Sequence, residues 1–137
     1  MDFETTVEFT GDFPGTMRCQ NGMVIEYSPP VELNGMKGPM TPEDAFIGAA
    51  NMCYQIVFRS IAAGLGLKVL SYKCRAVGDL QTVEGSKGFV RITMYPEISF
   101  EQGSNMANLE KALETTKRKC LVTNSISCEV RIEHRVI

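Results

Sequence analysis

The sequence predicts an α+β fold with the element order β-β-β-α-β-β-α-β. Short extended segments separated by turn residues fill the N-terminal part, and two amphipathic helical patterns follow, with further extended segments between and after them. Strands that come in runs, rather than alternating one by one with helices, favour α+β over a doubly wound sheet. The chain has 137 residues, of which 44% are hydrophobic, so we expect a single domain over residues 1–137 with a sizeable core.

Three short strands are expected before residue 28. The segments 6–9, 16–19 and 23–27 are rich in β-forming residues, and turn signals separate them. The second turn contains Asn21-Gly22, a pair that readily adopts the positive φ angles of a tight hairpin. Residues 28–40 then carry three prolines and two glycines, which indicates a long loop of the kind that often serves a function.

The first helix has a clear start and end in the sequence. Thr41 is a suitable N-cap, Pro42 suits the first helical position, and Glu43 places negative charge in the first turn. Apolar residues recur beyond that turn at three- and four-residue spacing, which predicts one buried face with Cys53 near its centre. Gly64 marks the expected end.

Two longer strands, a second helix and a final strand complete the prediction. Residues 68–77 and 89–100 alternate in the manner of strands, and a polar segment containing glycines separates them. Asn105 is expected to cap the second helix, whose apolar stripe leads to Cys120. Residues 128–137 alternate apolar and charged side chains, which predicts a closing strand.

Charge and composition exclude several classes of partner and site. The net charge is −2 at pH 7 and no basic patch is concentrated anywhere, which argues against nucleic acid or an anionic membrane surface. No stretch approaches the roughly 18 apolar residues of a membrane span, and no secretory signal pattern is present, so we expect a cytoplasmic location. Five irregularly spaced cysteines fit a reducing compartment. Without paired Cys or His spacings, we expect no zinc site.

The residues alone leave the roles of two cysteines open. Cys53 is placed to become a reactive thiolate if a cation lowers its pKa. A free cysteine on an apolar helix face is equally well explained as a small buried core residue. Cys120 continues the stripe of the second helix, and by itself it is expected in the core.

Two segments resemble the osmotically inducible protein C and organic hydroperoxide resistance family. They are Pro42-Glu43-Asp44 with the small residues that follow it up to Cys53, and Lys119-Cys120-Leu121-Val122-Thr123-Asn124-Ser125-Ile126 before the last strand. The order of elements matches over nearly the whole chain. The resemblance implies an intertwined homodimer in which sheets from both chains wrap two long helices. Thr41 and Leu121 depart from the hydroperoxide-resistance subgroup, which usually has Asn-Pro-Glu before the helix and Cys-Pro at the second cysteine.

The resemblance also implies an activity. The best-characterised members reduce organic hydroperoxides in oxidative-stress defence through a reactive and a resolving cysteine, without a metal or cofactor. By position, Cys53 matches the reactive cysteine, Cys120 matches the resolving cysteine that forms a disulfide with it, and Glu43 matches a glutamate that helps activation. A dithiol reductant would then reopen the disulfide by exchange.

The arginine that such a site needs has no motif of its own here. Arg18 is our candidate because it is the only arginine in the N-terminal strands. Arg59 and Arg118 remain alternatives, since a lone arginine on a hairpin is usually solvated. Glu43 has a simpler explanation as well, because a carboxylate in a first helical turn is favoured by the helix dipole.

A second hypothesis is a non-catalytic dimeric module that binds a small apolar ligand, in which the cysteines are incidental. Five apolar residues are candidates to wall a pocket for such a ligand, or for the organic part of a hydroperoxide: Met36, Met40, Phe46, Met52 and Tyr54. Methionine adapts to irregular shapes, which suits this use. Ordinary core and dimer contacts explain the same residues.

Overall fold

The computed structural model describes all residues from 1 to 137, and they form two compact units, residues 1–46 and residues 47–137. The first unit contains an antiparallel sheet of three strands in sequential order, β1 (Thr5–Glu8), β2 (Gly15–Cys19) and β3 (Val24–Tyr27). The predicted N-terminal meander is therefore confirmed. The long loop that follows contains a single short 3-10 turn, η1 (Val31–Leu33).

Helix α1 (Pro42–Gly64) begins and ends where the sequence predicts. The Thr41 hydroxyl accepts a hydrogen bond from the Asp44 backbone N–H at 3.0 Å and donates one to the Asp44 carboxylate at 2.9 Å. This exchange satisfies a backbone donor that the first helical turn leaves without an intrahelical partner. Pro42 has no N–H to lose, so it fits the first helical position.

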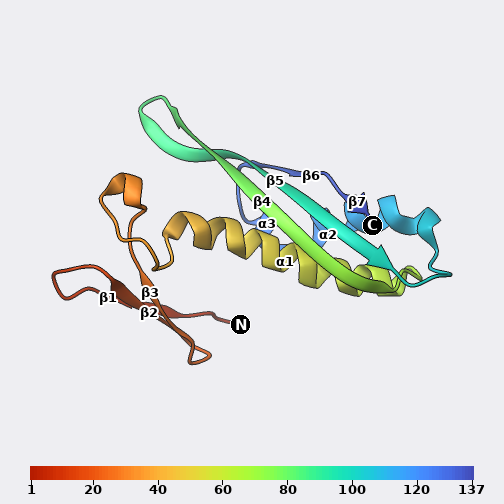
Figure 1. Ribbon diagram of the computed structural model, residues 1–137, viewed down its shortest axis with the longest axis horizontal. Coiled ribbons are helices and arrows are strands. Elements are labelled where there is room, and N and C mark those ends of the chain that lie inside the picture. Colours follow the sequence, from red (N-terminus) through yellow and green to blue (C-terminus); the bar gives the residue numbers. More distant parts are fainter. The chain divides into compact units, whose positions relative to one another are not determined.

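The second unit combines most of α1 with a mixed sheet and further helices (Figure 1). Strands β4 and β5 form a long antiparallel hairpin, and β6 and β7 both pair in parallel with β5. The remaining elements are β4 (Val69–Val83), β5 (Ser86–Phe100), η2 (Met106–Asn108), α2 (Leu109–Lys119), α3 (Leu121–Asn124), β6 (Glu129–Ile132) and β7 (Arg135–Val136). The predicted α+β class is confirmed, with mixed rather than parallel sheet pairing.

The central hairpin is longer than predicted, because the polar glycine-containing segment is itself extended strand. The two strands pair continuously to Val83 and Ser86, apart from two register shifts, and a two-residue turn of Glu84 and Gly85 joins them. Both turn residues have positive φ, 50° and 79°, which suits the right-handed twist of a hairpin. Gly78 does not interrupt the strand either: Ile47 and Phe89 occupy the space where its side chain would lie.

The second helix and the last strand are each divided, in contrast to the prediction. Asn105 precedes a 3-10 turn and makes no capping hydrogen bond with its side chain, so the predicted cap is wrong. The α-helix begins only at Leu109 and ends at Lys119, and Cys120 separates it from α3 with an extended backbone. The predicted strand over residues 128–137 is interrupted at Glu133 and His134.

The core of the second unit lies between α1, the sheet and α2. The side chains of Ala50, Tyr54, Phe58 and Ala62 are completely buried, and their four-residue spacing forms one face of α1. The rings of Tyr54 and Phe58 stack with their centroids 6.4 Å apart, and Phe58 contacts Tyr72 of β4 at 6.0 Å. The Tyr54 hydroxyl donates a hydrogen bond to the carbonyl of Leu113 in α2 at 3.1 Å.

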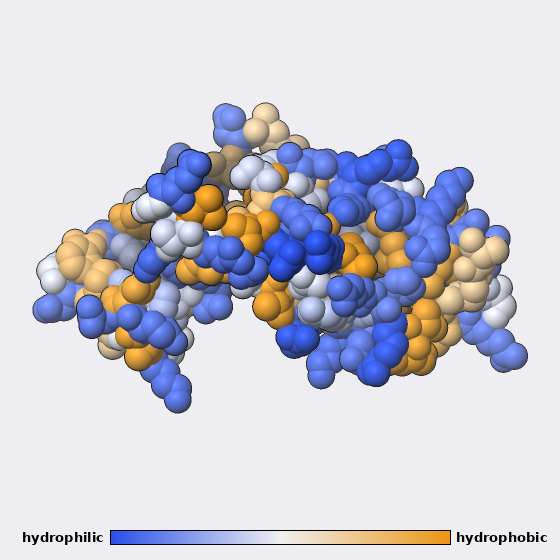
Figure 2. Space-filling view, turned by 90° about the horizontal axis from the view of Figure 1, so that it is seen from above, coloured by the Kyte–Doolittle hydropathy of each residue, from blue (hydrophilic) through white to orange (hydrophobic).

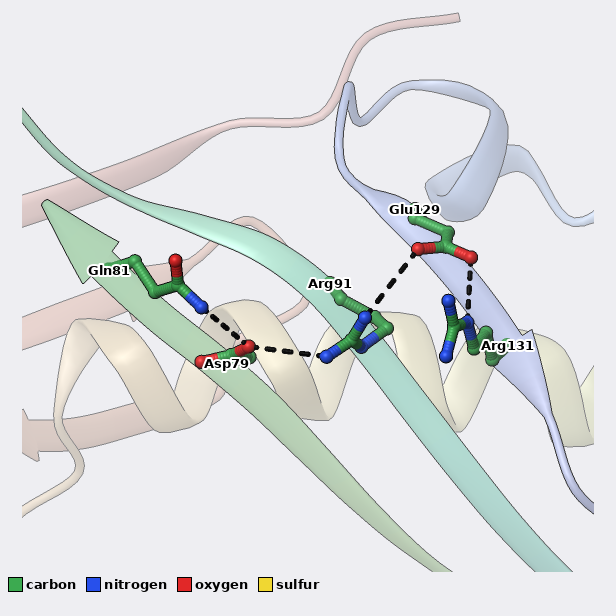
Figure 3. A network of polar contacts seen from close by, with 5 residues as sticks. All are labelled: Asp79, Gln81, Arg91, Glu129 and Arg131. Carbon is green, nitrogen blue, oxygen red and sulfur yellow. Dashed lines mark hydrogen bonds and ion pairs between the residues drawn. The ribbon is translucent and has the colours of Figure 1, made fainter. Parts of the chain in front are cut away.

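A polar network on the solvent side of the sheet links β4, β5 and β6 (Figure 3). Arg91 bridges Asp79 at 3.4 Å and Glu129 at 3.9 Å, and the second oxygen of Glu129 accepts a hydrogen bond from Arg131 at 2.7 Å. Gln81 donates a further hydrogen bond to Asp79 at 2.9 Å. Arg91 lies directly opposite Asp79 and Glu129 in the strand register, so the charges favour this alignment over a slipped one.

The surface view in Figure 2 shows mostly hydrophilic residues with apolar ones between them. None of the helices combines the length and the apolar character that crossing a bilayer requires. Two large apolar side chains of α1, Met52 and Ile56, are 64% and 65% exposed within the single chain. They lie on the side of the helix away from its buried face.

We expect the free energy of unfolding to fall as the pH rises above about 10, because Tyr54 is buried as a neutral phenol. Burial raises the pKa of Tyr54 above its ordinary value of 10.0, so the folded chain keeps a proton that the unfolded chain releases. The stabilisation from the neutral Tyr54 phenol is fully present below pH 10. Each pH unit above 10 then lowers the free energy of unfolding by about 1.4 kcal/mol. Urea unfolding between pH 8 and 11 measures the slope. For Tyr54→Phe, we expect the fall of the free energy of unfolding with pH to be less steep by this amount. An unchanged slope would contradict the burial of Tyr54 as a neutral phenol.

Candidate functional site

The structure brings Cys53 and Cys120 together within the second unit. Cys53 lies in the middle of α1, and its side chain is partly exposed. Cys120 lies between α2 and α3 and is completely buried. Both are free thiols, and each lies within hydrogen-bonding reach of the other. Two cysteines from distant parts of the sequence thus form one thiol pair.

The surroundings of Cys53 favour its protonated form. Burial raises the pKa of the Cys53 thiol, and the neighbouring Cys120 raises it further. The backbone N–H groups of Val122 and Leu121 oppose this increase by hydrogen bonding to the sulfur. The groups with the largest effect on this pKa include no cationic side chain. A reactive thiolate at neutral pH needs a positive neighbour in addition to them.

The surroundings of Cys120 favour its anionic form. Burial raises the pKa of the Cys120 thiol, but the neighbouring polar groups, Thr123 foremost, outweigh burial and lower the pKa. The Cys53 thiol and the Val122 N–H act in the same direction. The two thiols are therefore unequal, with Cys53 the proton donor and Cys120 the better place for a negative charge.

Sequence reasoning missed the residues that surround this pair. Leu121, Val122 and Thr123, in the short turn that follows Cys120, are among the groups that shift the pKa values of the two thiols. No residue pattern in the sequence signalled their place beside the thiols. A proline at position 121 would have no N–H to donate.

Arg18 and Glu43 both lie in the first unit, and they do not form an ion pair with each other. Arg18 is exposed on β2, opposite Thr6 and Val24. Glu43 is in the first turn of α1, and its Oε2 atom is buried without a hydrogen-bond partner. A buried carboxylate oxygen without a hydrogen-bond partner is energetically costly, so we expect a hydrogen-bond donor to approach Glu43 Oε2.

The first unit contains an apolar cavity of about 500 Å³ between its sheet and the start of α1. It is lined by Val7, Met17, Ile25, Tyr27, Met40, Thr41, Pro42, Ala45 and Phe46. Met40 and Phe46 were among the five predicted pocket residues, whereas Tyr54 is a core residue of the second unit. Met17 faces the cavity, so its neighbour Arg18 points to the opposite face of the strand.

The remaining three cysteines and the single histidine belong to other elements of the chain. Cys19 is on β2 of the first unit, Cys74 is on β4, and Cys128 directly precedes β6. The His134 side chain lies 3.5 Å from the carboxylate of Glu110. No three His, Cys, Asp or Glu side chains are grouped so that they could hold a metal ion.

Comparison with known proteins identifies relatives of this fold. Residues 35–135 match the family described as OsmC-like protein. An OsmC-like protein of unknown function from Vibrio cholerae has a TM-score of 0.91 at 24% identity, with 98% of this chain and 99% of that chain covered. An organic hydroperoxide resistance protein, OsmC, from Legionella pneumophila has a TM-score of 0.76 at 19% identity, with coverage of 99% and 96%. An OsmC-like protein from Mycoplasma pneumoniae has 0.83 at 13% identity, with coverage of 100% and 98%. No curated protein matches this chain.

Proposed function

This chain belongs to the OsmC-like protein family, and we propose that it is a thiol-dependent peroxidase that reduces organic hydroperoxides in oxidative-stress defence. Organic hydroperoxide resistance proteins are among the structures that share its fold. The observation that carries the proposal is that Cys53 and Cys120 lie close enough for each thiol to shift the pKa of the other. We place this activity in the reducing environment of the cytoplasm, where such thiols stay available.

The proposed cycle uses the two thiols in turn. The Cys53 thiolate attacks one oxygen of the hydroperoxide, the O–O bond breaks, and the alkoxide leaves and takes up a proton as the alcohol. Cys53 is then a sulfenic acid. The Cys120 thiolate attacks this sulfur, forming the Cys53–Cys120 disulfide and releasing hydroxide, which is protonated to water. A dithiol reductant restores both thiols by exchange and becomes a disulfide itself.

A cation is needed for the first step, because burial and Cys120 hold the pKa of Cys53 above its ordinary value. We propose Arg18 for this role and Glu43 as the carboxylate that orients it. The unpartnered buried oxygen of Glu43 is consistent with such a use. Arg18 makes no ion pair within its own unit that would have to be broken.

We also propose that residues 1–137 act as a single domain within an intertwined homodimer. The support is the apolar surface of α1, where Met52 and Ile56 are largely exposed in the single chain. Exposed apolar side chains on the long central helix are what a second copy of the chain would cover.

Mass spectrometry of thiol labelling tests the proposal. The reduced protein is treated with one equivalent of cumene hydroperoxide, quenched with N-ethylmaleimide and digested. We expect a new peptide pair joined through Cys53 and Cys120, and unchanged labelling of Cys19, Cys74 and Cys128. If all five thiols stay free after exposure to the hydroperoxide, the protein is not a thiol peroxidase.

The apolar cavity supports a second candidate function, a non-catalytic module that binds a small apolar ligand. Nearly all of the cavity lining is apolar, and none of the five cysteines lies on it. This function predicts that all five thiols react slowly with N-ethylmaleimide and that hydroperoxide does not protect Cys53. The labelling experiment above therefore distinguishes the two functions.

A further inference from the structure

A polar groove of about 590 Å³ lies on the solvent side of the sheet, within the second unit. Small organic ligands occupy hollows of this volume. We call it the outer groove. Its lining comes from β4, β5 and the chain around the end of β6 and the start of β7, and it includes Lys73, Arg75, Tyr95, Glu97, Glu133 and Arg135.

The outer groove is on the face of the sheet that is turned away from α1. The ring of Tyr72 on β4 contacts a phenylalanine of α1, so this side chain faces the helix. Side chains alternate between the two faces of a strand, which places Lys73 and Arg75 on the opposite face. Met52 and Ile56 share a hollow with Tyr72. A second copy that covers these two residues is therefore on the other side of the sheet from the outer groove.

Three charged side chains of the outer groove have no ionic partner. The arginines of the neighbouring network bind carboxylates (Figure 3), and Arg135 forms an ion pair with Glu97 at 2.9 Å. Lys73 lies opposite Glu97 in the strand register, but Glu97 binds Arg135 instead. Arg75 and Glu133 form no ion pair either. The outer groove thus presents two unpaired cations and one unpaired carboxylate.

Arg75 is held in place by a contact that leaves its hydrogen-bond donors free. Its Cζ atom lies over the ring of Tyr95, 4.6 Å from the ring centroid, and Tyr95 is also its partner in the strand register. A ring face attracts the charge of the guanidinium and restricts its motion. The planar fork of N–H groups matches a carboxylate, which it can bind through two hydrogen bonds. Arg75 is therefore prepared to bind a carboxylate.

The unpaired charges of opposite sign lie on opposite sides of the outer groove. Lys73 and Arg75 are on β4, and Tyr95 is on β5 in the middle. Glu133 directly follows β6, and its backbone N–H donates a hydrogen bond to the carbonyl of Met94 in β5 at 2.8 Å. Two strand spacings, about 10 Å, therefore separate the cationic side from the anionic side. An extended peptide of about three residues has a similar length.

We propose that the outer groove binds a short peptide by its two ends. Arg75 and Lys73 bind the C-terminal carboxylate, and Glu133 binds the N-terminal ammonium group. A ligand with one charge would leave one side of the outer groove without a partner, and a ligand with two negative charges would meet Glu133 with the wrong sign. Because no cysteine takes part, this binding does not depend on the proposed peroxidase activity.

A matched series of small peptides tests the two ends of the ligand. Triglycine is the probe, N-acetyl-triglycine lacks the ammonium group, and triglycinamide lacks the carboxylate. Each is titrated into the isotope-labelled full chain, and backbone amide signals are followed by nuclear magnetic resonance. We expect triglycine to shift the signals of the outer groove and to bind about tenfold more tightly than either blocked peptide, as for loss of one hydrogen bond between charged groups.

Three results of this titration would overturn the proposal. The first is that millimolar triglycine shifts no signal of the outer groove. The second is that N-acetyl-triglycine binds as tightly as triglycine, which would indicate a simple anion site. The third is that triglycinamide binds as tightly as triglycine, because the unpaired cations would then have no role.

Variants assign each end of the peptide to its side chain. Arg75→Gln should weaken the binding of triglycine about tenfold and leave that of triglycinamide unchanged. Glu133→Gln should weaken the binding of triglycine and leave that of N-acetyl-triglycine unchanged. Lys87→Gln removes a positive charge from β5 outside the outer groove, so it should bind triglycine like the unaltered chain.

The three replaced side chains are exposed, so the core stays intact in every variant. Equal affinity for triglycine in Arg75→Gln, Glu133→Gln and the unaltered chain would exclude this site. An equal loss in Lys87→Gln would exclude it as well, because the effect would then follow the net charge and not the position of the side chain.

Discussion

Replacing Cys53 by serine is expected to reduce consumption of an organic hydroperoxide to the rate of the reductant alone. Serine at this position is close in size to cysteine, but its hydroxyl is a far weaker nucleophile toward the O–O bond and cannot form a disulfide. The measurement follows the loss of cumene hydroperoxide in the presence of excess dithiothreitol. Unchanged turnover in Cys53→Ser would rule out the proposed mechanism.

One further variant tests the step that forms the disulfide, and another serves as a control. Cys120→Ser should undergo one oxidation and then stall without a disulfide, leaving a sulfenic acid on Cys53 that dimedone traps. Cys74→Ser alters a thiol in the same unit, on β4, where burial raises the pKa of the group. Its turnover should equal that of the unaltered chain. Loss of activity in Cys74→Ser would show that the effect at Cys53 is not specific.

Local signals predicted the elements whose ends are set by local chemistry. Thr41 and Pro42 place the start of α1 correctly because a side-chain cap and a missing N–H act within one helical turn. Asn105 offered the same kind of signal and was misleading. Its side chain makes no cap, and the chain passes through a 3-10 turn before α2 begins at Leu109.

Contacts between distant residues explain the errors in the long hairpin. Gly78 looked like an interruption of the strand, but it is required there because Ile47 and Phe89 fill the space next to its Cα atom. The sequence alone does not show that these two side chains lie beside Gly78. The Glu84-Gly85 turn was harder to predict because glutamate seldom adopts positive φ.

The thiol pair is also a contact between distant residues that local sequence signals did not predict. Helical spacing placed Cys53 and Cys120 on separate apolar stripes, and the residues alone explained both as core. Only the resemblance to a known family connected them, and the fold then places the two thiols close enough to shift each other's pKa. Thr123 lies in the quoted motif, and only the turn of the backbone at Cys120 places its hydroxyl against the carbonyls of Lys117 and Cys120.

Phe58→Ala is expected to have the largest effect on stability, a loss of about 3–5 kcal/mol in the free energy of unfolding. Phe58 is completely buried, and its ring contacts Tyr54 at 6.4 Å and Tyr72 at 6.0 Å between centroids. Removing it opens a cavity that joins α1 to β4, and two tyrosines lose their aromatic neighbour. Because α1 also carries Cys53, we expect the loss of packing at Phe58 to disturb the thiol pair as well.

Urea unfolding at one fixed protein concentration measures this loss, because assembly with a second copy would make the stability depend on concentration. Phe58→Leu keeps an apolar side chain in the same space and should recover part of the loss. At the exposed position two residues earlier, Ile56→Ala should cost less than about 0.5 kcal/mol if α1 is uncovered. A large cost at Ile56 would indicate that a second copy buries this side of the helix. A cost below about 1 kcal/mol for Phe58→Ala would mean that the aromatic cluster does not hold α1 against the sheet.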